Sequence, residues 1–221
     1  MSEELSNLIT VTEPRSPISE AYRTLRTNLD FASLDEALKT LVVTSAGVGE
    51  GKSTTLANLA TVSAQAGRKV ILVDADLRRP TMHQVFGLTN DQGLTTVVMD
   101  DSALRAPPVQ ETGIEGLSVL TSGPLPPNPA ELMGSRRMEE VVGALANLAD
   151  QVFFDTPPVV AVTDAAVLAT KVDGVLLVIS AGKTRREYAH SAVQRLEQIN
   201  ARLVGTVLTG VRMDAGFRGY Y

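Results

Sequence analysis

The sequence contains no cysteine and no long hydrophobic run. Without cysteine, disulfide bonds and thiolate metal sites are excluded, and the composition is compatible with a reducing compartment. The longest apolar stretches, such as residues 175–179, fall far short of the about 20 residues that span a bilayer. The N-terminus is acidic and lacks an apolar segment, so no signal peptide is predicted. We therefore expect a soluble protein without direct membrane insertion.

A surplus of basic residues is also missing. The 221 residues include 20 Lys and Arg against 25 Asp and Glu, which gives a net charge of −5. Proteins that bind nucleic acids generally carry a positive surplus, so we expect no nucleic-acid partner. The hydrophobic content of 44% is sufficient for the core of one large domain.

Short runs of Val, Ile and Leu alternate with segments of helical periodicity along most of the chain. This alternation predicts an α/β fold, with a mostly parallel central sheet covered by helices on both faces. We expect a flexible leader over residues 1–16, one domain over 17–209, and a flexible tail over 210–221. Strands are predicted at 40–44, 69–73, 117–121, 151–155, 174–180 and 202–208. Helices are predicted at 19–31, 52–66, 130–148, 163–170 and 184–199.

A glycine-rich segment, residues 45–54, lies between a predicted strand and a predicted helix. Its glycines allow a sharp turn in which successive N–H groups face an anion, and the helix that follows adds its positive end. Lys52 can reach the β- and γ-phosphates of a nucleotide, and the Ser53 hydroxyl is placed to ligate Mg²⁺. The segment therefore predicts a P-loop that binds ATP and Mg²⁺. The expected binding residues are Gly47, Val48, Gly49, Glu50, Gly51, Lys52, Ser53 and Thr54.

Acidic residues follow two of the predicted strands. Asp74 and Asp76 end the strand at 69–73, and Asp155 ends the strand at 151–155. Ligands collect at the carboxyl ends of strands in sheets of this type. These aspartates could simply start turns or cap helices. In the functional interpretation Asp155 holds Mg²⁺, while Asp74 and Asp76 position its surroundings or take a proton from an incoming hydroxyl.

Three segments together resemble the bacterial tyrosine kinases (BY-kinases) of capsule and exopolysaccharide loci, of the CpsD/CapB and Wzc type. They are the P-loop, the sequence Val-Asp-Ala-Asp-Leu-Arg at 73–78 and the sequence Phe-Phe-Asp-Thr-Pro-Pro at 153–158. The resemblance extends over nearly the whole chain. It implies a P-loop kinase domain in which Lys52 and Ser53 bind ATP·Mg²⁺. It further implies that Asp74 is the base toward a tyrosine hydroxyl, and that Asp76 and Asp155 organise the metal.

The same resemblance covers two segments outside the P-loop region. Glu20, Arg23 and Arg26 match an E-x-x-R-x-x-R oligomerisation motif, although alone they would be read as a solvated charged face. Tyr220 and Tyr221 end the chain and would be phosphoacceptors for a neighbouring subunit of a homo-oligomeric ring. A membrane-bound polysaccharide co-polymerase would activate this cytoplasmic protein and recruit it to the inner face of the membrane.

Two other functions stay open. ParA/MinD-type ATPases share the expected fold, but they carry a second lysine five residues before the P-loop lysine, where this chain has Gly47. A nucleotide-dependent assembly module could regulate a polysaccharide exporter without effective kinase activity. Tyr22 and Tyr188 fall on predicted helices and are interpreted as packing residues.

Overall fold

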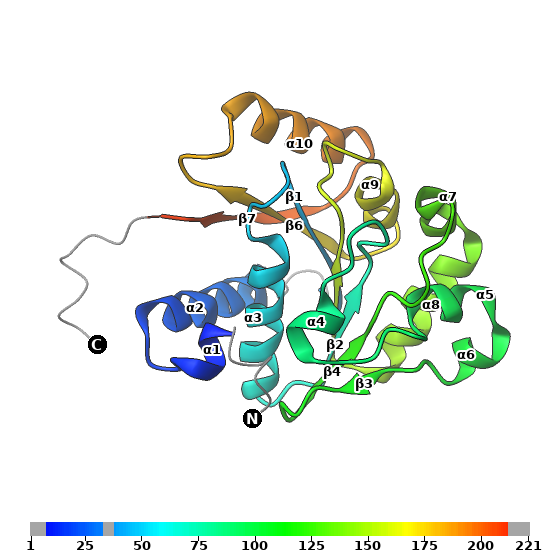
Figure 1. Cartoon of the computed structure of the whole chain (residues 1–221). Helices are drawn as coiled ribbons and strands as arrows, with labels where there is room; N and C mark the ends of the chain where they lie inside the picture. Colours follow the sequence, from blue (N-terminus) through cyan, green and yellow to red (C-terminus); the bar gives the residue numbers. More distant parts are fainter. Residues whose placement is uncertain (1–7, 33–37, 212–221) are drawn as a thin grey trace.

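The computed structural model describes residues 8–32 and 38–211 (Figure 1). The predictions for residues 1–7 and 212–221 lie outside these ranges, and so do both C-terminal tyrosines. Within the described residues no helix is both long enough and apolar enough to cross a membrane.

A seven-stranded sheet forms the centre of the described part of the chain, with the strand order β3-β4-β2-β5-β1-β6-β7. Neighbouring strands run parallel, except that β3 pairs antiparallel with β4 at one edge. The strands are β1 (Thr40–Ser45), β2 (Val70–Asp74), β3 (Gln110–Glu111), β4 (Leu117–Leu120), β5 (Gln151–Asp155), β6 (Gly174–Ser180) and β7 (Leu203–Thr209). This confirms the predicted mostly parallel α/β fold.

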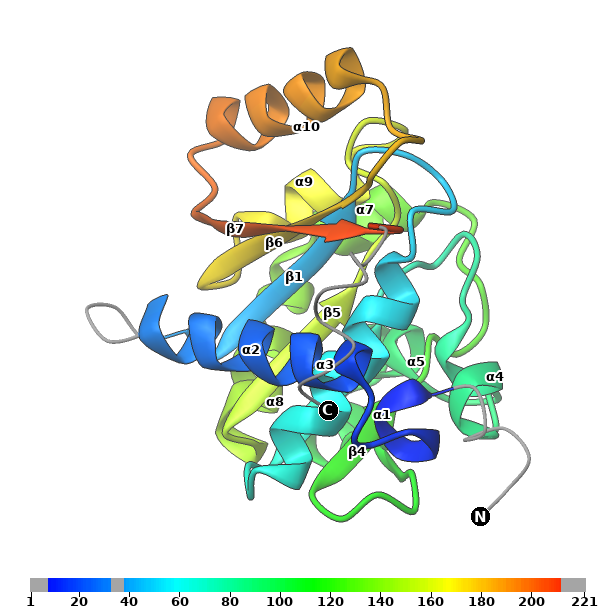
Figure 2. The same ribbon diagram turned by 90° about the vertical axis from the view of Figure 1, so that its left-hand side faces the viewer.

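Helices cover both faces of the sheet, which explains why the central strands are apolar at nearly every position (Figure 2). On β1, Leu41 and Val43 point into one core and Val42 into the other. The first core is closed by α1 (Ile9–Thr12), α2 (Pro17–Ala32), α3 (Lys52–Gln65) and α4 (Met82–Phe86). The second is closed by α5 (Leu94–Met99), α6 (Asp101–Arg105), α7 (Pro129–Gly134), α8 (Arg136–Leu148), α9 (Asp164–Ala169) and α10 (Arg186–Gln198).

The structure corrects the single helix predicted at 130–148. The chain breaks at Ser135, whose backbone is extended at φ −65° and ψ 152°. The Ser135 hydroxyl oxygen accepts a hydrogen bond from the Met138 amide and so caps α8. Short elements were also missed by the sequence interpretation, namely α1, α4, α5, α6 and β3.

The flexible leader predicted over residues 1–16 is wrong for residues 8–16. Leu8 is buried, and the backbone amide and hydroxyl of Thr10 both donate to Asn58 Oδ1, at 3.1 and 2.8 Å. Asn58 lies on α3, so these bonds dock α1 against the helix that follows the P-loop. The contact joins residues 48 positions apart, so the local sequence pattern does not predict it.

The strand register brings the predicted site residues together. Asp74 and Asp155 are paired positions at the carboxyl ends of adjacent strands β2 and β5. β1 lies on the other side of β5 and leads directly into the P-loop. The phosphate-binding loop and the aspartates therefore meet at one edge of the sheet, as predicted.

Candidate active site

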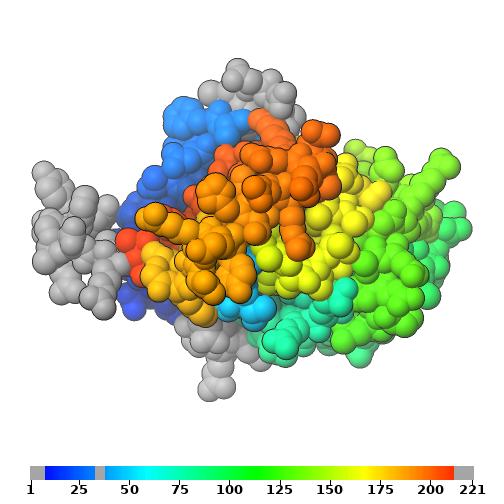
Figure 3. Space-filling view, turned by 90° about the horizontal axis from the view of Figure 1, so that it is seen from above, coloured from blue at the N-terminus to red at the C-terminus, as the bar shows by residue number. Residues whose placement is uncertain are grey.

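The P-loop connects β1 to α3 by a turn that requires glycine. Gly49 and Gly51 have φ values of 71° and 84°, in the left-handed region that other residues avoid. Gly51 is the N-cap of α3, so the amides at the start of this helix face the loop. The loop lines a cavity of about 440 Å³ together with residues that follow β2 and β5. Viewed from above, the loop reaches the surface between the segment after β6 and the residues after β2 (Figure 3).

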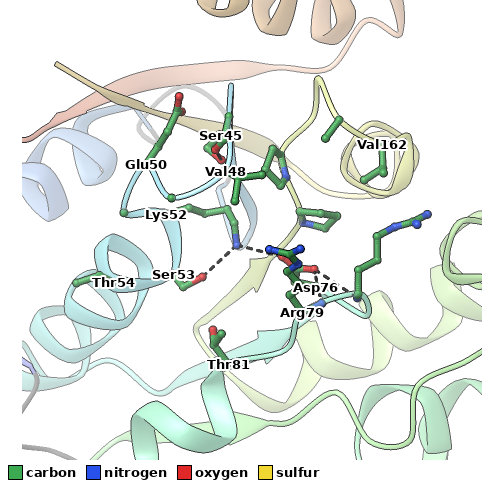
Figure 4. A pocket seen from close by; sticks show the side chains of 17 residues that line it. Ser45, Val48, Glu50, Lys52, Ser53, Thr54, Asp76, Arg79, Thr81 and Val162 are labelled. Atoms are coloured by element: carbon green, nitrogen blue, oxygen red, sulfur yellow. Dashed lines mark hydrogen bonds and ion pairs between the residues drawn. The ribbon is translucent and has the colours of Figure 1, made fainter. Parts of the chain in front are cut away.

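Lys52 lies at the centre of this cavity (Figure 4). Its Nζ is 2.5 Å from Asp155 Oδ1 and 3.7 Å from Asp76 Oδ2, and it donates to Ser53 Oγ at 3.1 Å. The Ser53 hydroxyl in turn donates to Asp155 Oδ2 at 2.6 Å. Asp155 is fully buried; burial raises the pKa of its carboxyl, and Lys52 opposes that shift. The predicted phosphate lysine, the metal-binding serine and two predicted metal aspartates thus form one polar cluster.

Asp74 is buried beside this cluster, on the strand next to Asp155. Its Oδ2 accepts the backbone amides of Thr81 and Met82, at 2.9 and 2.8 Å. Its Oδ1 has no hydrogen-bond partner among the described residues. Burial, followed by the nearby Asp155 carboxylate, raises the Asp74 pKa to about 7. A carboxyl group with this pKa can accept a proton near neutral pH.

Asp76 is held by the loop that it starts. Its Oδ1 accepts the backbone amides of Arg78 and Arg79, at 3.4 and 3.1 Å. Arg78 then reaches across the cavity to Asp164, the first residue of α9, in a two-pronged contact of 2.8 and 3.0 Å. Asp164 is 1% exposed. This ion pair connects the loop after β2 with the segment after β5, and so holds the two walls of the cavity together.

The sequence interpretation missed Asp164 as a site residue. It begins the helix predicted at 163–170, where an acidic residue is ordinary and favourable. Its partner Arg78 is 86 positions earlier in the chain. No local signal connects the two residues.

Glu50, predicted as a nucleotide-binding residue, has its side chain turned into the protein. Its carboxylate accepts the Ala46 amide at 3.0 Å and the Thr184 hydroxyl at 2.5 Å. The Glu50 carbonyl accepts the Thr209 hydroxyl at 2.7 Å, and Lys183 donates to the Gly49 carbonyl at 2.9 Å. Residues from the ends of β6 and β7 therefore brace the loop from outside. Val48 and Thr54 line the cavity, and their contact with a nucleotide stays a prediction.

The predicted metal ligands suit Mg²⁺. Ser53, Asp76 and Asp155 all offer oxygen, and Mg²⁺ is commonly held by one or two carboxylates plus phosphate oxygens and water. The described residues contain no group of three or more acidic or histidine side chains poised around a metal.

The predicted oligomer-interface residues make contacts within the chain. Arg23 pairs with Glu20 and donates to the Pro14 carbonyl at 2.7 Å. Arg26 donates to the Val62 carbonyl of α3 at 3.0 Å. These bonds fix α2 against α3 and the chain that precedes α2. Their role between subunits stays a prediction.

Comparisons with known proteins agree with this geometry. A family model described as the CobQ/CobB/MinD/ParA nucleotide binding domain matches residues 41–217. Tyrosine-protein kinase YwqD of Bacillus subtilis (strain 168) is 49% identical, over 97% of this chain and 91% of that protein. Putative tyrosine-protein kinase CapB of Staphylococcus aureus is 37% identical, over 98% of this chain and 95% of that protein.

A solved structure extends the agreement to the fold. The kinase domain of Escherichia coli tyrosine kinase ETK is 35% identical and superposes with a TM-score of 0.88, over 97% of this chain and 88% of that one. Both the predicted family and the predicted P-loop fold are confirmed. The chain therefore belongs to the bacterial tyrosine-protein kinases and carries their nucleotide-binding domain.

Proposed function

We propose that this protein transfers the γ-phosphoryl group of ATP to Tyr220 and Tyr221 of a neighbouring copy of the same chain. The observation that carries the proposal is Asp74, a buried carboxyl group with a pKa of about 7 and one oxygen without a partner among the described residues. Phosphoryl transfer to any hydroxyl nucleophile, whether water or a phenol, needs a group that orients the nucleophile or takes its proton. Asp74 can meet this need, and the relatives named tyrosine-protein kinases favour a phenol as the nucleophile.

The chemistry divides among residues of this chain. The loop amides and Lys52 hold the phosphates, and Ser53, Asp76 and Asp155 would hold Mg²⁺. The ion would neutralise the negative charge that develops on the phosphates during transfer. Asp74 takes the phenol proton as the phenol oxygen forms a bond to the γ-phosphorus. The bond from that phosphorus to the oxygen shared with the β-phosphate breaks, and ADP leaves.

The proposal extends to regulation of capsular or exopolysaccharide polymerisation and export. A membrane-bound polysaccharide co-polymerase subunit would activate the protein at the inner face of the membrane, and the chain itself would be cytoplasmic. Subunits would assemble into a ring through Glu20, Arg23 and Arg26. Support comes from the family resemblance and from the acidic net charge of −5, which disfavours a nucleic-acid partner.

The ParA/MinD alternative meets a physical obstacle at Gly47. Its characteristic second lysine would occupy this position, where a Cβ atom would lie 3.0 Å from Glu50 Oε1. A side chain at this position would push the Glu50 carboxylate by a few tenths of an ångström against its bonds to Ala46 and Thr184. The geometry therefore favours the kinase over this ATPase class.

Mass spectrometry of the C-terminal peptide tests the proposed function. The chain is incubated with ATP and Mg²⁺, with and without the cytoplasmic part of the membrane partner. Phosphate is expected on Tyr220 or Tyr221, and far less is expected when Asp74→Asn is treated in the same way. An unmodified peptide from a chain that binds ATP would contradict the proposal.

A further inference from the structure

The hydroxyl of Thr81 is a buried polar group that the phosphate chemistry does not use. Thr81 precedes α4 in the N-cap position, where a threonine hydroxyl usually accepts a backbone amide, yet it makes no such bond. Its Oγ1 is buried without a partner in the part of the chain that the structure describes. Thr81 nevertheless lines the main cavity, and Figure 4 shows its side chain directed up into it. Buried hydroxyls without partners are rare and unfavourable, which suggests that a ligand completes this one.

A second unpaired polar atom lies on the neighbouring side chain. Asp74 Oδ2 accepts the Thr81 amide at 2.9 Å, so the two residues are in direct contact, and Asp74 Oδ1 is also buried and unpaired. When the Asp74 carboxyl is ionised, its Oδ1 can only accept a hydrogen bond, whereas the Thr81 hydroxyl can donate one. A single hydroxyl group satisfies both, because it donates to Asp74 and accepts from Thr81.

The cavity wall formed by the segment after β5 is apolar. Pro157, Pro158, Ala161 and Val162 line it, and Val48 of the P-loop adds to the same cavity. Hydrogen bonds with β1 fix this wall. The Thr44 hydroxyl donates to the Pro157 carbonyl at 2.8 Å, and the Val159 amide donates to the Ser45 carbonyl at 3.0 Å. A rigid apolar wall suits the flat face of an aromatic ring better than it suits water or a small aliphatic alcohol.

We propose that Thr81 and the apolar wall at 157–162 form the acceptor subsite, in which Thr81 binds the phenol oxygen and Val162 contacts the ring. This inference rests on the proposed kinase function and adds the residues that select tyrosine. Thr81 donates its hydrogen bond to the phenol oxygen and so holds it beside Asp74. That carboxylate then takes the phenol proton as the oxygen attacks the γ-phosphorus. A trapped water is the competing occupant of the two polar atoms.

A mixing experiment isolates the acceptor step. The enzyme chain carries Tyr220→Phe and Tyr221→Phe and so cannot be labelled at these positions, and the acceptor chain carries Lys52→Ala and cannot transfer phosphate. Thr81, Thr81→Val and Thr81→Ser are compared in the enzyme chain, with the acceptor concentration varied. Nucleotide affinity is measured separately for each enzyme with a fluorescent ATP analogue, and folding is checked by thermal unfolding.

Thr81→Val removes the hydroxyl and keeps the shape. We expect it to lower kcat/KM for the acceptor by about tenfold or more, because the phenol oxygen loses its donor. Thr81→Ser should restore most of the loss, and the nucleotide Kd should stay within about twofold for both variants. Unchanged acceptor kinetics in Thr81→Val would overturn the inference and leave the water as occupant. A parallel loss of nucleotide affinity would overturn it in favour of a phosphate-binding role.

Val162→Ala tests the apolar wall separately. We expect a rise of about threefold in KM for the acceptor with little change in kcat, because ring contact is lost in binding and in transfer alike. An unchanged KM would remove Val162 from the subsite. An enzyme with native Thr81 that labels no acceptor at all would contradict the proposed kinase function itself. This result differs from unchanged kinetics in Thr81→Val or Val162→Ala, which would contradict only the acceptor subsite.

Discussion

The two halves of the cavity differ in how completely their polar groups are satisfied. On the nucleotide side, Lys52, Ser53 and Glu50 all have partners, and residues from β7 and the segment after β6 brace the loop. On the acceptor side, Asp74 and Thr81 each keep one buried oxygen without a partner among the described residues. The polar groups of the nucleotide side are therefore satisfied within the chain, whereas we propose that the substrate completes those of the acceptor side.

The largest expected effect comes from removing the centre of the nucleotide side. Lys52→Ala deletes the charge that would hold the β- and γ-phosphates, and it leaves buried Asp155 without its counter-charge. We expect phosphoryl transfer to fall by more than about 100-fold, with weakened nucleotide binding. Labelling with radioactive ATP and a nucleotide-binding titration measure the two effects. Lys183→Ala is the matched control, because this exposed lysine contacts only the outside of the loop, and a loss above about threefold there would contradict the assignment.

On the acceptor side, Asp74→Asn should separate transfer from nucleotide binding. We expect kcat to fall by about 100-fold or more, because the amide cannot take a proton, while the nucleotide Kd stays nearly constant. Single-turnover transfer and a binding titration make the comparison. Equal losses in the transfer rate and in nucleotide affinity would mean that Asp74 acts in nucleotide binding, and the two halves of the cavity would then not differ in function.

The same variant has a predicted effect on stability. The folded pKa of Asp74 is raised from its ordinary value near 3.8 to about 7, so wild-type stability decreases as pH rises between these values. Asp74→Asn carries no charge at any pH and so removes this loss. At pH 8 the variant should be more stable by a few kcal/mol, with the difference vanishing near pH 4. Denaturant unfolding at the two pH values measures this, and a constant difference would contradict the raised pKa.

A smaller effect is expected where the two halves are joined. Asp164→Asn weakens the ion pair with Arg78. This ion pair holds the loop after β2, which contains Asp76. We expect an increase of about tenfold in the Mg²⁺ concentration needed for half-maximal transfer. A Mg²⁺ titration at saturating ATP measures this shift. Arg78→Lys keeps the charge but loses the two-pronged contact, so it should behave similarly, and normal Mg²⁺ dependence in both would show that the pair is merely structural.

The smallest effect is expected at the outer brace of the P-loop. Thr184→Val removes one of the two bonds to the Glu50 carboxylate and leaves the other intact. We expect nucleotide affinity to weaken by about three- to tenfold, since one hydrogen bond to a buried charged group is lost. Isothermal titration with ATP and Mg²⁺ measures it. Unchanged affinity would mean that the loop keeps its shape without this contact.

The sequence predicted the nucleotide side better than the acceptor side, for a physical reason. The P-loop depends on glycine and lysine spacing within ten residues, and the aspartates are placed by strands whose apolar runs are easy to recognise. The pairing of Arg78 with Asp164 and the bracing of Glu50 by Thr184 join residues 86 and 134 positions apart. That the Thr81 hydroxyl lacks a partner could not be predicted from the sequence, because it depends on how Thr81 packs beside Asp74 in the folded chain.

The pH dependence of phosphoryl transfer to the Lys52→Ala acceptor tests the central claim most directly. If the Asp74 carboxylate is the base that takes the phenol proton, kcat/KM should rise with pH through a midpoint near 7, where Asp74 loses its own proton. In Asp74→Asn this rise should disappear from the residual activity. A flat profile for the wild type, or the same rise in the variant, would contradict the role assigned to Asp74.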